Sequence, residues 1–230
     1  MKLVCKLSED GFEVEESKII DLNCKKEFKY TFWKQNNVYA EFYKEEAIDM
    51  LYLSLAVFAA DRLILRETGA DAWSREIELY MPVLCVDKWN ACQSLVEEML
   101  NFLTGDRWKL YFRERELTEI ETKARKKWEK VTEKNLNISK ICMFSGGLDS
   151  CIGALNLLCD KEDAPDIAFV SHYGGGKGTV EYQRMLKEAF INKFNLDERC
   201  FIQNYAAIVS KKEDKTEDTT RSRSFMFFYN

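Results

Sequence analysis

The chain has 230 residues, of which 46% are hydrophobic and 32% are charged, so it has enough apolar sequence for one large or two small globular domains. Its formal net charge of -5 at pH 7 argues against nucleic acid as the default partner, because neutralising phosphates requires clustered cations. The most apolar stretch, residues 50–60, is well short of the roughly 20 residues that cross a bilayer, and residues 1–10 lack the apolar core of a signal peptide. We therefore expect a cytoplasmic protein with no membrane partner.

Residues 1–112 predict a small N-terminal α+β domain. Apolar and polar residues alternate over residues 28–32, and Asn36-Asn37 follows as a turn before residues 38–40, a pattern that predicts a hairpin or a small sheet. A long helix is expected from about residue 45 to residue 66. It is apolar on nearly all sides in its middle and therefore needs cover from several directions.

Two further strands are expected in this domain. Residues 76–81 alternate as a half-exposed strand, and Pro82 should end that strand or place it at a sheet edge. An amphipathic helix starts at Asp87, and residues 109–112 form one more candidate strand. Because strands are grouped around helices without an evident β–α–β repeat, the pattern indicates an α+β arrangement.

Charged residues crowd the segment 113–138, which we interpret as a charged helical linker. Its apolar residues recur every three or four positions, as in a helix with one solvated face. The basic residues of 123–127 are interleaved with glutamates, and this mixture favours a solvated face over a phosphate-binding patch.

Residues 139–230 predict a parallel α/β domain, because strand and helix patterns alternate along the segment. The expected order is a strand to residue 144, a helix to about 159, a strand over 167–170, a helix over 179–194 and a strand over 200–203. In such sheets ligands bind beyond the carboxyl ends of the strands, so the loops that follow the strands should converge on one site.

The most informative feature is the hexapeptide SGGLDS, Ser145–Ser150, at the junction of the first strand and helix of this domain. Two adjacent glycines allow a sharp turn and leave amide N–H groups free to form an anion-binding nest. The helix N-terminus adds its positive dipole end, and Ser145 and Ser150 add hydroxyl groups, so a pyrophosphate is the natural occupant. The alternative is a simple loop in which Asp149 or Ser150 caps the helix. A Walker A loop is disfavoured, because the only glycine-rich segment with a lysine, at Lys177, has the wrong flanking residues.

The cysteines do not form a metal-binding pattern. Eight cysteines are present without a Cys-x-x-Cys pair, and His172 is the sole histidine, so no zinc-finger spacing exists. Cys142, Cys151 and Cys159 are expected to be reduced thiols on the apolar faces of the strand and helix around the hexapeptide. A catalytic thiol at Cys151 is the alternative.

The hexapeptide after a strand resembles the PP-loop of the ATP pyrophosphatases, a superfamily that binds ATP, forms an acyl or imidoyl adenylate and releases pyrophosphate. Two later segments are similar to motifs of the 7-cyano-7-deazaguanine synthases, the QueC-like family. Ser171-His172-Tyr173-Gly174 resembles its YGQ segment, with glycine in place of glutamine. Residues 223–227, RSFMF, resemble its RN-x-x-F segment, with serine in place of asparagine.

Segments outside the hexapeptide are similar to one branch of this family. Residues 73–77 and 220–224, together with the long sequence before the loop, resemble the QueC-like proteins of antiphage (antiviral) defence, the QatC type. Family members carry further sequence after the RN-x-x-F segment, which in the housekeeping enzymes includes zinc-binding cysteines. The resemblance therefore implies a chain that is truncated at its C-terminus and lacks the zinc site of the family.

The resemblance implies roles for particular residues. Those expected to bind ATP are Ser145, Gly146, Gly147, Leu148, Asp149, Ser150, His172 and Tyr173. Asp149 would hold Mg²⁺ or orient the loop. Arg223 and Lys177 are the expected catalytic cations beside the leaving pyrophosphate, where charge accumulates, and Arg221 is a further candidate. Lys177 as a solvated loop lysine and His172 as a packed residue at a strand end remain open alternatives.

The function implied is an ATP-dependent carbon–nitrogen ligase of the 7-cyano-7-deazaguanine synthase type, which belongs to queuosine biosynthesis in its housekeeping form. Such an enzyme activates the carboxylate of a carboxylated 7-deazaguanine with ATP, lets ammonia attack and dehydrates the amide to a nitrile. The expected partners are ATP, a small-molecule carboxylate and, in the defence branch, a partner protein. A non-catalytic ATP-binding subunit, or a truncated fragment of a defence complex, is the alternative. Amide formation of the asparagine-synthetase type is a third reading that rests on the loop alone.

Overall fold

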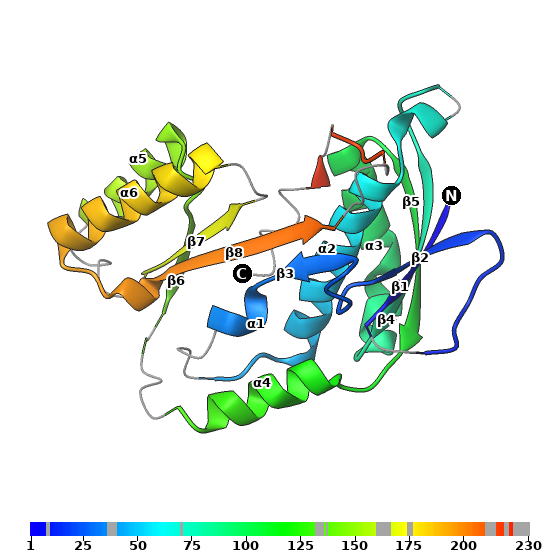
Figure 1. Cartoon of the computed structure of the whole chain (residues 1–230), viewed down its shortest axis with the longest axis horizontal. Helices are drawn as coiled ribbons and strands as arrows, with labels where there is room; N and C mark the ends of the chain where they lie inside the picture. Colours follow the sequence, from blue (N-terminus) through cyan, green and yellow to red (C-terminus); the bar gives the residue numbers. More distant parts are fainter. Residues whose placement is uncertain are drawn as a thin grey trace. The chain divides into compact units, whose positions relative to one another are not determined.

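A computed structural model describes residues 1–7, 10–35, 41–69, 71–131, 136, 138–159, 167–173, 177–209, 215–218 and 221–222. The chain forms two compact units (Figure 1). The first unit comprises Met1–Lys29, Tyr43–Thr118 and Ala207–Asn230, and the second comprises Tyr30–Phe42 and Glu119–Ala206. Both units are discontinuous along the chain, unlike the contiguous segments 1–112, 113–138 and 139–230 expected from the sequence.

The first unit is built on a sheet with the strand order β2-β1-β4-β5. These strands are β1 (Lys2–Lys6), β2 (Ser17–Asp21), β4 (Glu76–Val83) and β5 (Arg107–Glu114). All of the strand pairs in this sheet are parallel, and helix α3 (Val86–Thr104) connects β4 to β5 as a β–α–β unit. The α+β expectation for this region is therefore wrong, because strands distant in the sequence pair in parallel.

Pro82 lies inside β4, which runs on to Val83 between β1 and β5. The expectation that Pro82 ends the strand or marks an edge is wrong for a geometric reason. Glu78 N donates to Met1 O on the β1 side, whereas Val83 O accepts from Arg115 N on the β5 side. Successive residues alternate between the two sides, so Pro82 faces β1, whose pairing with β4 reaches only Tyr80. The missing N–H of proline therefore breaks no ladder bond.

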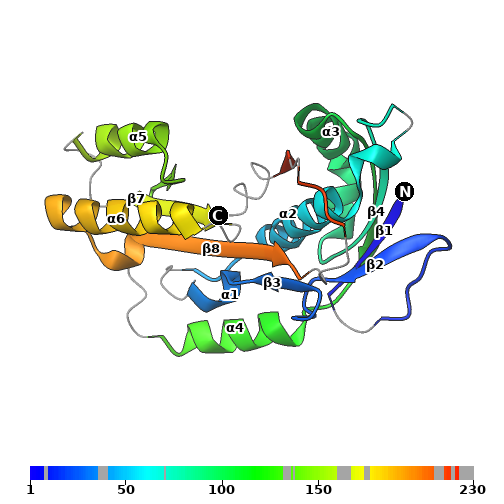
Figure 2. The ribbon, with the colours of Figure 1, turned by 45° about the horizontal axis from the view of Figure 1, so that its top comes forward.

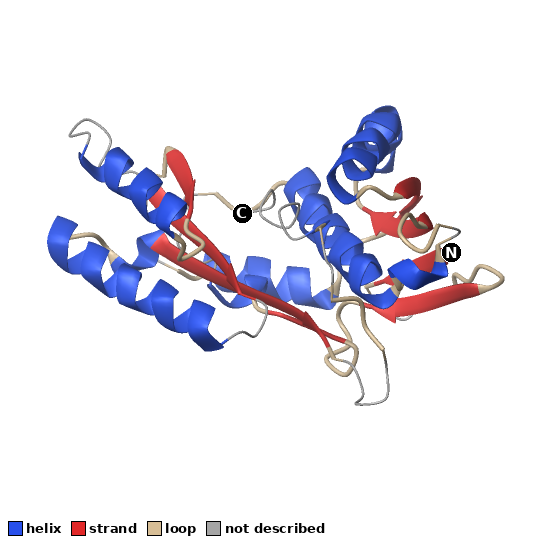
Figure 3. Ribbon diagram, turned by 90° about the horizontal axis from the view of Figure 1, so that it is seen from above, coloured by secondary structure: helices blue, strands red, loops and turns tan. Residues whose placement is uncertain are grey.

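Helix α2 (Glu45–Leu63) is the most buried helix of the first unit, as its apolar run predicts, and it ends before the short 3₁₀ helix η1 (Arg66–Thr68). α2 and α3 lie on one side of the sheet (Figures 1 and 3). The buried Asp49 of α2 accepts hydrogen bonds from the N–H groups of Leu84 and Cys85 and from Trp89 Nε1. A carboxylate of one helix thus caps the N-terminus of the next.

A buried network of charges lies beside the end of α2. Arg75 is 1% exposed, and its Nη2 atom lies 2.6 Å from Asp61 Oδ1 and 2.5 Å from Asp106 Oδ2. Arg66 also contacts Asp106, at 3.2 Å. The N–H groups of Arg221 and Ser222 each donate to Asp61 Oδ2 at 2.9 Å, so this C-terminal segment belongs to the core of the first unit. The sequence had assigned the segment to the second domain.

The second sheet has the order β3-β8-β7-β6, and its strands β6 and β7, together with β8 up to Ala206, belong to the second unit. The strands are β3 (Phe28–Tyr30), β6 (Lys140–Met143), β7 (Ile167–Tyr173) and β8 (Phe201–Ile208). β6, β7 and β8 are parallel, as expected. β3 joins β8 in the opposite direction, since Thr31 N donates to Tyr205 O and Val209 N donates to Glu27 O. The second unit is therefore α/β, and β3 adds one antiparallel strand to the edge of its parallel sheet.

Helices α5 (Leu148–Cys159) and α6 (Lys177–Phe194) cover one face of these parallel strands (Figure 2). Their shared core contains Phe144, Phe169 and Phe190, whose rings meet edge to face at centroid distances of 5.3–6.3 Å. The core fixes the positions of both helix N-termini at the carboxyl ends of β6 and β7.

The helices α1 (Phe32–Gln35) and α4 (Glu119–Glu129) lie on the other side of the strands (Figure 2). Phe32 therefore begins a helix and does not continue a strand, which corrects the hairpin expectation, and residues 36–40 lie outside the described part. Helix α4 belongs to the second unit, where Trp128 packs on Phe42 and Arg125 lies over the same ring at 5.3 Å. Among the described residues no helix is long and apolar enough to cross a membrane.

Candidate functional site

The hexapeptide Ser145–Ser150 lies between β6, which ends at Met143, and α5, which begins at Leu148. The predicted order of strand, loop and helix is therefore confirmed. Ser145, Gly147 and Asp149 are exposed, and Leu148 is 74% exposed. The loop is thus exposed to solvent at the carboxyl end of β6, and parallel α/β sheets bind ligands at this end of their strands.

The two serine hydroxyl groups form hydrogen bonds within the loop. Ser145 Oγ donates to Ser150 Oγ at 3.1 Å, and Ser150 Oγ donates to Gly147 O at 2.9 Å. Gly147 N in turn donates to Ser145 Oγ at 3.4 Å. Helix α5 begins at Leu148, so Asp149 and Ser150 lie inside its first turn, and neither occupies the N-cap position that the capping alternative requires. The hydrogen bonds close a ring that holds the loop in one conformation.

Gly146 is the glycine that the loop geometry requires. Its φ is +90°, a conformation that residues with a side chain rarely adopt, and an added Cβ would lie 3.0 Å from Gln183 Cγ. At Gly147 an added Cβ would meet only Ser145 Oγ at an ordinary 3.7 Å. The sequence predicted that both glycines serve the turn, but steric necessity is confined to the first.

Gln183 is a site residue that the sequence analysis missed. It lies on α6 and is only 3% exposed, although its side chain is polar. Its Nε2 atom donates to Ser145 O at 3.0 Å and to His172 O at 3.2 Å, and its Oε1 atom accepts from Gln203 Nε2 at 2.7 Å. A signal for it exists, since Gln183 falls on the same helical stripe as the core residue Phe190, where an apolar residue is expected.

The end of β7 lies beside the loop, as predicted from the parallel order. Ser171 Oγ donates to Phe144 O at 2.6 Å, one residue before the hexapeptide. His172 is 5% exposed and brings its carbonyl to Gln183, which agrees with the alternative of a packed residue at a strand end. The ring of Tyr173 lies 5.0 Å from that of Tyr205 on β8. Residues 171–173 and 145–150 are therefore brought together.

Two of the expected catalytic residues cannot be placed at the site. Arg223 lies outside the described residues, as do residues 174–176. Lys177 is the first residue of α6, but its side chain lies outside the described part. Arg221 belongs to the first unit, where its guanidinium lies 5.0 Å from the ring of Trp73.

Asp149 is the only carboxylate of the hexapeptide and is exposed. Mg²⁺ in nucleotide sites is commonly held by one or two carboxylates together with the phosphates of the substrate. Asp149 fits that arrangement, in which the ion would neutralise phosphate charge. Among the described residues no group of three or more potential ligands (His, Cys, Asp or Glu) is placed to bind a metal without a nucleotide.

The cysteines near the loop differ from one another. Cys142 is buried, and burial raises the pKa of its thiol, which opposes thiolate reactivity. Cys151 is half-buried against the core of the second unit, as expected. Cys159 is exposed, so its predicted place on an apolar face is wrong. It is the last residue of α5.

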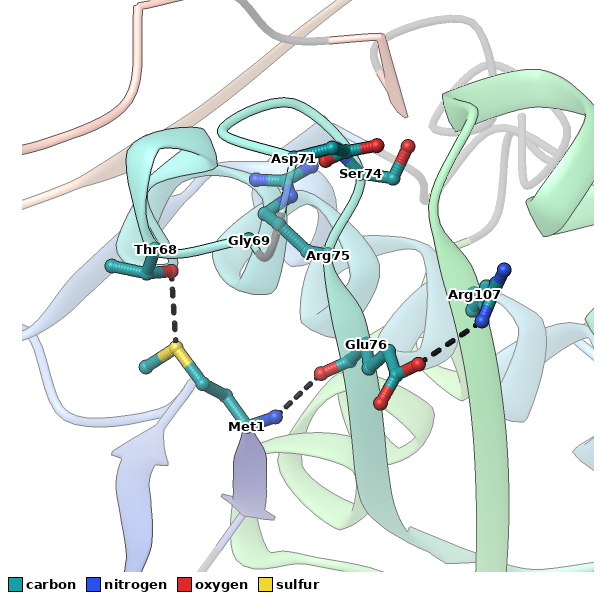
Figure 4. Close-up of a pocket in the computed structure, with 8 residues that line it drawn as sticks. All are labelled: Met1, Thr68, Gly69, Asp71, Ser74, Arg75, Glu76 and Arg107. Atoms are coloured by element: carbon teal, nitrogen blue, oxygen red, sulfur yellow. Dashed lines mark hydrogen bonds and ion pairs between the residues drawn. The ribbon is translucent and has the colours of Figure 1, made fainter.

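A separate cavity of about 510 Å³ lies in the first unit (Figure 4). It is lined by Met1, Thr68, Gly69, Asp71, Ser74, Arg75, Glu76 and Arg107. Its cations are engaged by neighbours, since Arg107 pairs with Glu76 at 3.2 Å and Arg75 pairs with the buried aspartates. The hexapeptide, by contrast, combines backbone amides and a helix N-terminus in an exposed loop.

Comparison with known proteins finds no protein-family model, no curated protein and no solved structure that matches the chain.

Proposed function

We propose that the second unit binds ATP at Ser145–Ser150 and that the chain is an adenylate-forming ATP pyrophosphatase of the PP-loop type. The observation that carries the proposal is the exposed, self-bonded loop at the junction of a parallel strand and a helix N-terminus, with Gly146 at φ +90°. This arrangement combines backbone amides, two hydroxyl groups and a helix dipole on one side, which suits a pyrophosphate.

Each part of the loop has a place in the proposed chemistry. The amides from Gly146 to Ser150 would bind the β- and γ-phosphates, and Asp149 would hold the Mg²⁺ that neutralises their charge. Lys177 and Arg223 are the proposed cations at the leaving pyrophosphate. Ser171, His172 and Tyr173 follow the neighbouring strand, and this segment is proposed to line the nucleotide side of the site.

The proposed substrate is a small-molecule carboxylate, by resemblance to the 7-cyano-7-deazaguanine synthases. Attack of the carboxylate on the α-phosphate forms an acyl adenylate and releases pyrophosphate, and ammonia then displaces AMP to give an amide. We also propose that the chain acts in antiviral defence in the cytoplasm, together with a partner protein. This part of the proposal rests on the resemblance of residues 73–77 and 220–224 to the QatC type. One residue of each segment is in contact in the first unit, where Arg221 lies over Trp73.

One observation favours the alternative of a non-catalytic ATP-binding subunit. No lysine or arginine side chain among the described residues hydrogen-bonds to the hexapeptide. The described part of the chain therefore shows no cation held against the loop that would stabilise a leaving pyrophosphate. A subunit that binds ATP without cleaving it would need no such group.

Pyrophosphate release separates the two functions. Purified chain is incubated with Mg²⁺, ATP and candidate carboxylates with ammonia, and pyrophosphate is measured by a coupled assay. The enzyme is expected to release pyrophosphate and AMP, and Ser145→Ala/Asp149→Ala should abolish this release. Ser139→Ala, an exposed serine just before β6, is the matched control and should retain it. ATP binding without pyrophosphate would establish the non-catalytic subunit.

A further inference from the structure

Gln183 connects the three parallel strands of the second unit at the end where the loop lies. Its amide N–H groups reach Ser145 O after β6 and His172 O on β7, and its carbonyl accepts from Gln203 on β8. Both functions of this 3% exposed amide are thus satisfied by groups within the unit. A buried amide with all partners fixed is rigid, because breaking any one bond leaves a polar group without compensation.

We propose that Gln183 is the positioning residue of the nucleotide loop, an inference that rests on the proposed function. The bond to Ser145 O orients the peptide between Ser145 and Gly146. Peptide groups are planar, and the described residues contain no cis bond, so the Gly146 N–H points away from Gln183. No described residue accepts a hydrogen bond from that N–H, which leaves it directed to a ligand.

The packing of Gln183 reinforces this orientation. Its Cγ atom occupies the space where a side chain at Gly146 would lie, at 3.0 Å from the position of an added Cβ. Its backbone N lies 3.5 Å from the same position. Helix α6 therefore packs against the loop at Gly146. Gln183 orients the peptide between Ser145 and Gly146 and also fills the space beside Gly146. Gln203 holds the Gln183 carbonyl, so the Nε2 donors cannot rotate away.

Two substitutions separate positioning from packing. Gln183→Met keeps the length and the Cγ atom but removes both donors, and we expect ATP to bind about tenfold more weakly. Gln183→Glu replaces the donors with a carboxylate that faces two carbonyl oxygens when ionised, so it should weaken binding more at about pH 8. At about pH 5.5 the buried carboxyl is protonated and its single O–H can donate to one of the two carbonyls, so binding relative to wild type should recover in part.

The matched control is Asn192→Asp, the same change of amide to acid at an exposed position of α6. Its ATP affinity relative to wild type should not depend on pH. A Gln183→Glu variant whose relative affinity is equal at both pH values would overturn the positioning role. So would a Gln183→Met variant that binds ATP as wild type does.

Hydrogen exchange of the ligand-free chain tests the same inference without nucleotide. In Gln183→Met the amides of residues 146–150 should exchange faster, whereas amides in β6 and β7 should be unchanged. Uniformly faster exchange through the second unit would show that Gln183 serves packing only and would contradict the proposal. If wild type does not bind ATP yet the loop amides respond, the proposed function fails while the control of the loop by Gln183 stands.

Discussion

Polar groups are arranged in opposite ways in the first unit and in the hexapeptide of the second. Arg75, which is 1% exposed, lies between Asp61 and Asp106, and each charge has partners at fixed distances. The hexapeptide is exposed, and its hydroxyl groups bond to each other and to the backbone of Gly147. Ions that are buried must be paired, because desolvation costs more than an isolated charge can recover. The dense cluster of charge in the first unit is therefore a structural device, whereas the proposed ligand site is an exposed loop.

The largest effect is expected from breaking the buried network. Arg75→Met removes the cation between Asp61 and Asp106, and the free energy of unfolding should fall by about 3–5 kcal/mol because two buried carboxylates keep only the longer contacts with Arg66. Arg107→Met is the control, since its pair with Glu76 is largely exposed and should contribute little. Urea unfolding followed by circular dichroism measures both. Equal effects of the two substitutions would contradict the structural role of the network.

A smaller effect on stability, but a larger one on ligand binding, is expected at the loop. Gly146→Ala places a side chain at φ +90° and at 3.0 Å from Gln183 Cγ. The strain should lower the free energy of unfolding by about 1–3 kcal/mol and abolish ATP binding. Gly147→Ala meets no such obstacle and should be milder on both measurements. A Gly146→Ala variant that binds ATP normally would show that the loop conformation does not matter for the ligand.

The comparison also predicts a response to pH. Burial raises the pKa of Asp61, but hydrogen bonds from Arg75 and Ser222 outweigh it and lower the pKa below its ordinary value. The unfolded chain therefore binds more protons than the folded chain near the ordinary aspartate range, and stability from Asp61 is lost as pH falls through it. Asp61→Asn should flatten this acid loss in urea titrations from about pH 6 to about pH 3.

The pKa of Asp49 is shifted in the opposite direction to that of Asp61. Burial raises the pKa of Asp49 despite hydrogen bonds from Leu84 and Cys85. The folded chain then holds its proton more tightly, so its contribution to stability declines as pH rises through the raised pKa. Asp49→Asn should therefore change the slope of stability against pH in the direction opposite to Asp61→Asn. Slopes that change in the same direction would contradict the assignment of the two environments.

The smallest effect is expected on α5. An added Cβ at Gly153 meets nothing within 4 Å, and the residue lies in the middle of the helix. Gly153→Ala should raise the free energy of unfolding by about 0.5–1 kcal/mol, because alanine loses less backbone entropy in a helix. ATP binding should be unaffected. A loss of binding would extend the ligand site along the helix beyond the loop.

Local patterns predicted the parts of the fold that depend on neighbouring residues. The apolar run of α2 predicts its burial, and the alternation of strands and helices after residue 139 predicts the parallel order of β6, β7 and β8. The position of the hexapeptide is predicted correctly because glycine and serine favour loops between a strand and a helix, and glycine readily adopts the positive φ seen at Gly146.

Features that depend on distant residues could not be predicted in this way. β1 pairs with β4 across more than 70 positions, and Asp61 accepts from Ser222 across 161 positions. The periodicity of nearby residues carries no information about either contact. The sequence pattern therefore predicts an α+β arrangement where the structure has a parallel sheet. Gln183 is different, because one polar residue on an apolar helical stripe is a usable signal of a buried amide and of the loop that it holds.

The most direct test of the account is calorimetry of Mg²⁺-ATP binding to the wild type and to Ser145→Ala/Asp149→Ala, with Ser139→Ala as the control. We predict that the wild type and the control bind one nucleotide per chain with the same affinity and that the double variant, although folded, binds none. Equal binding by the double variant would place the nucleotide elsewhere, and no binding by wild type would mean that the exposed loop is only a turn.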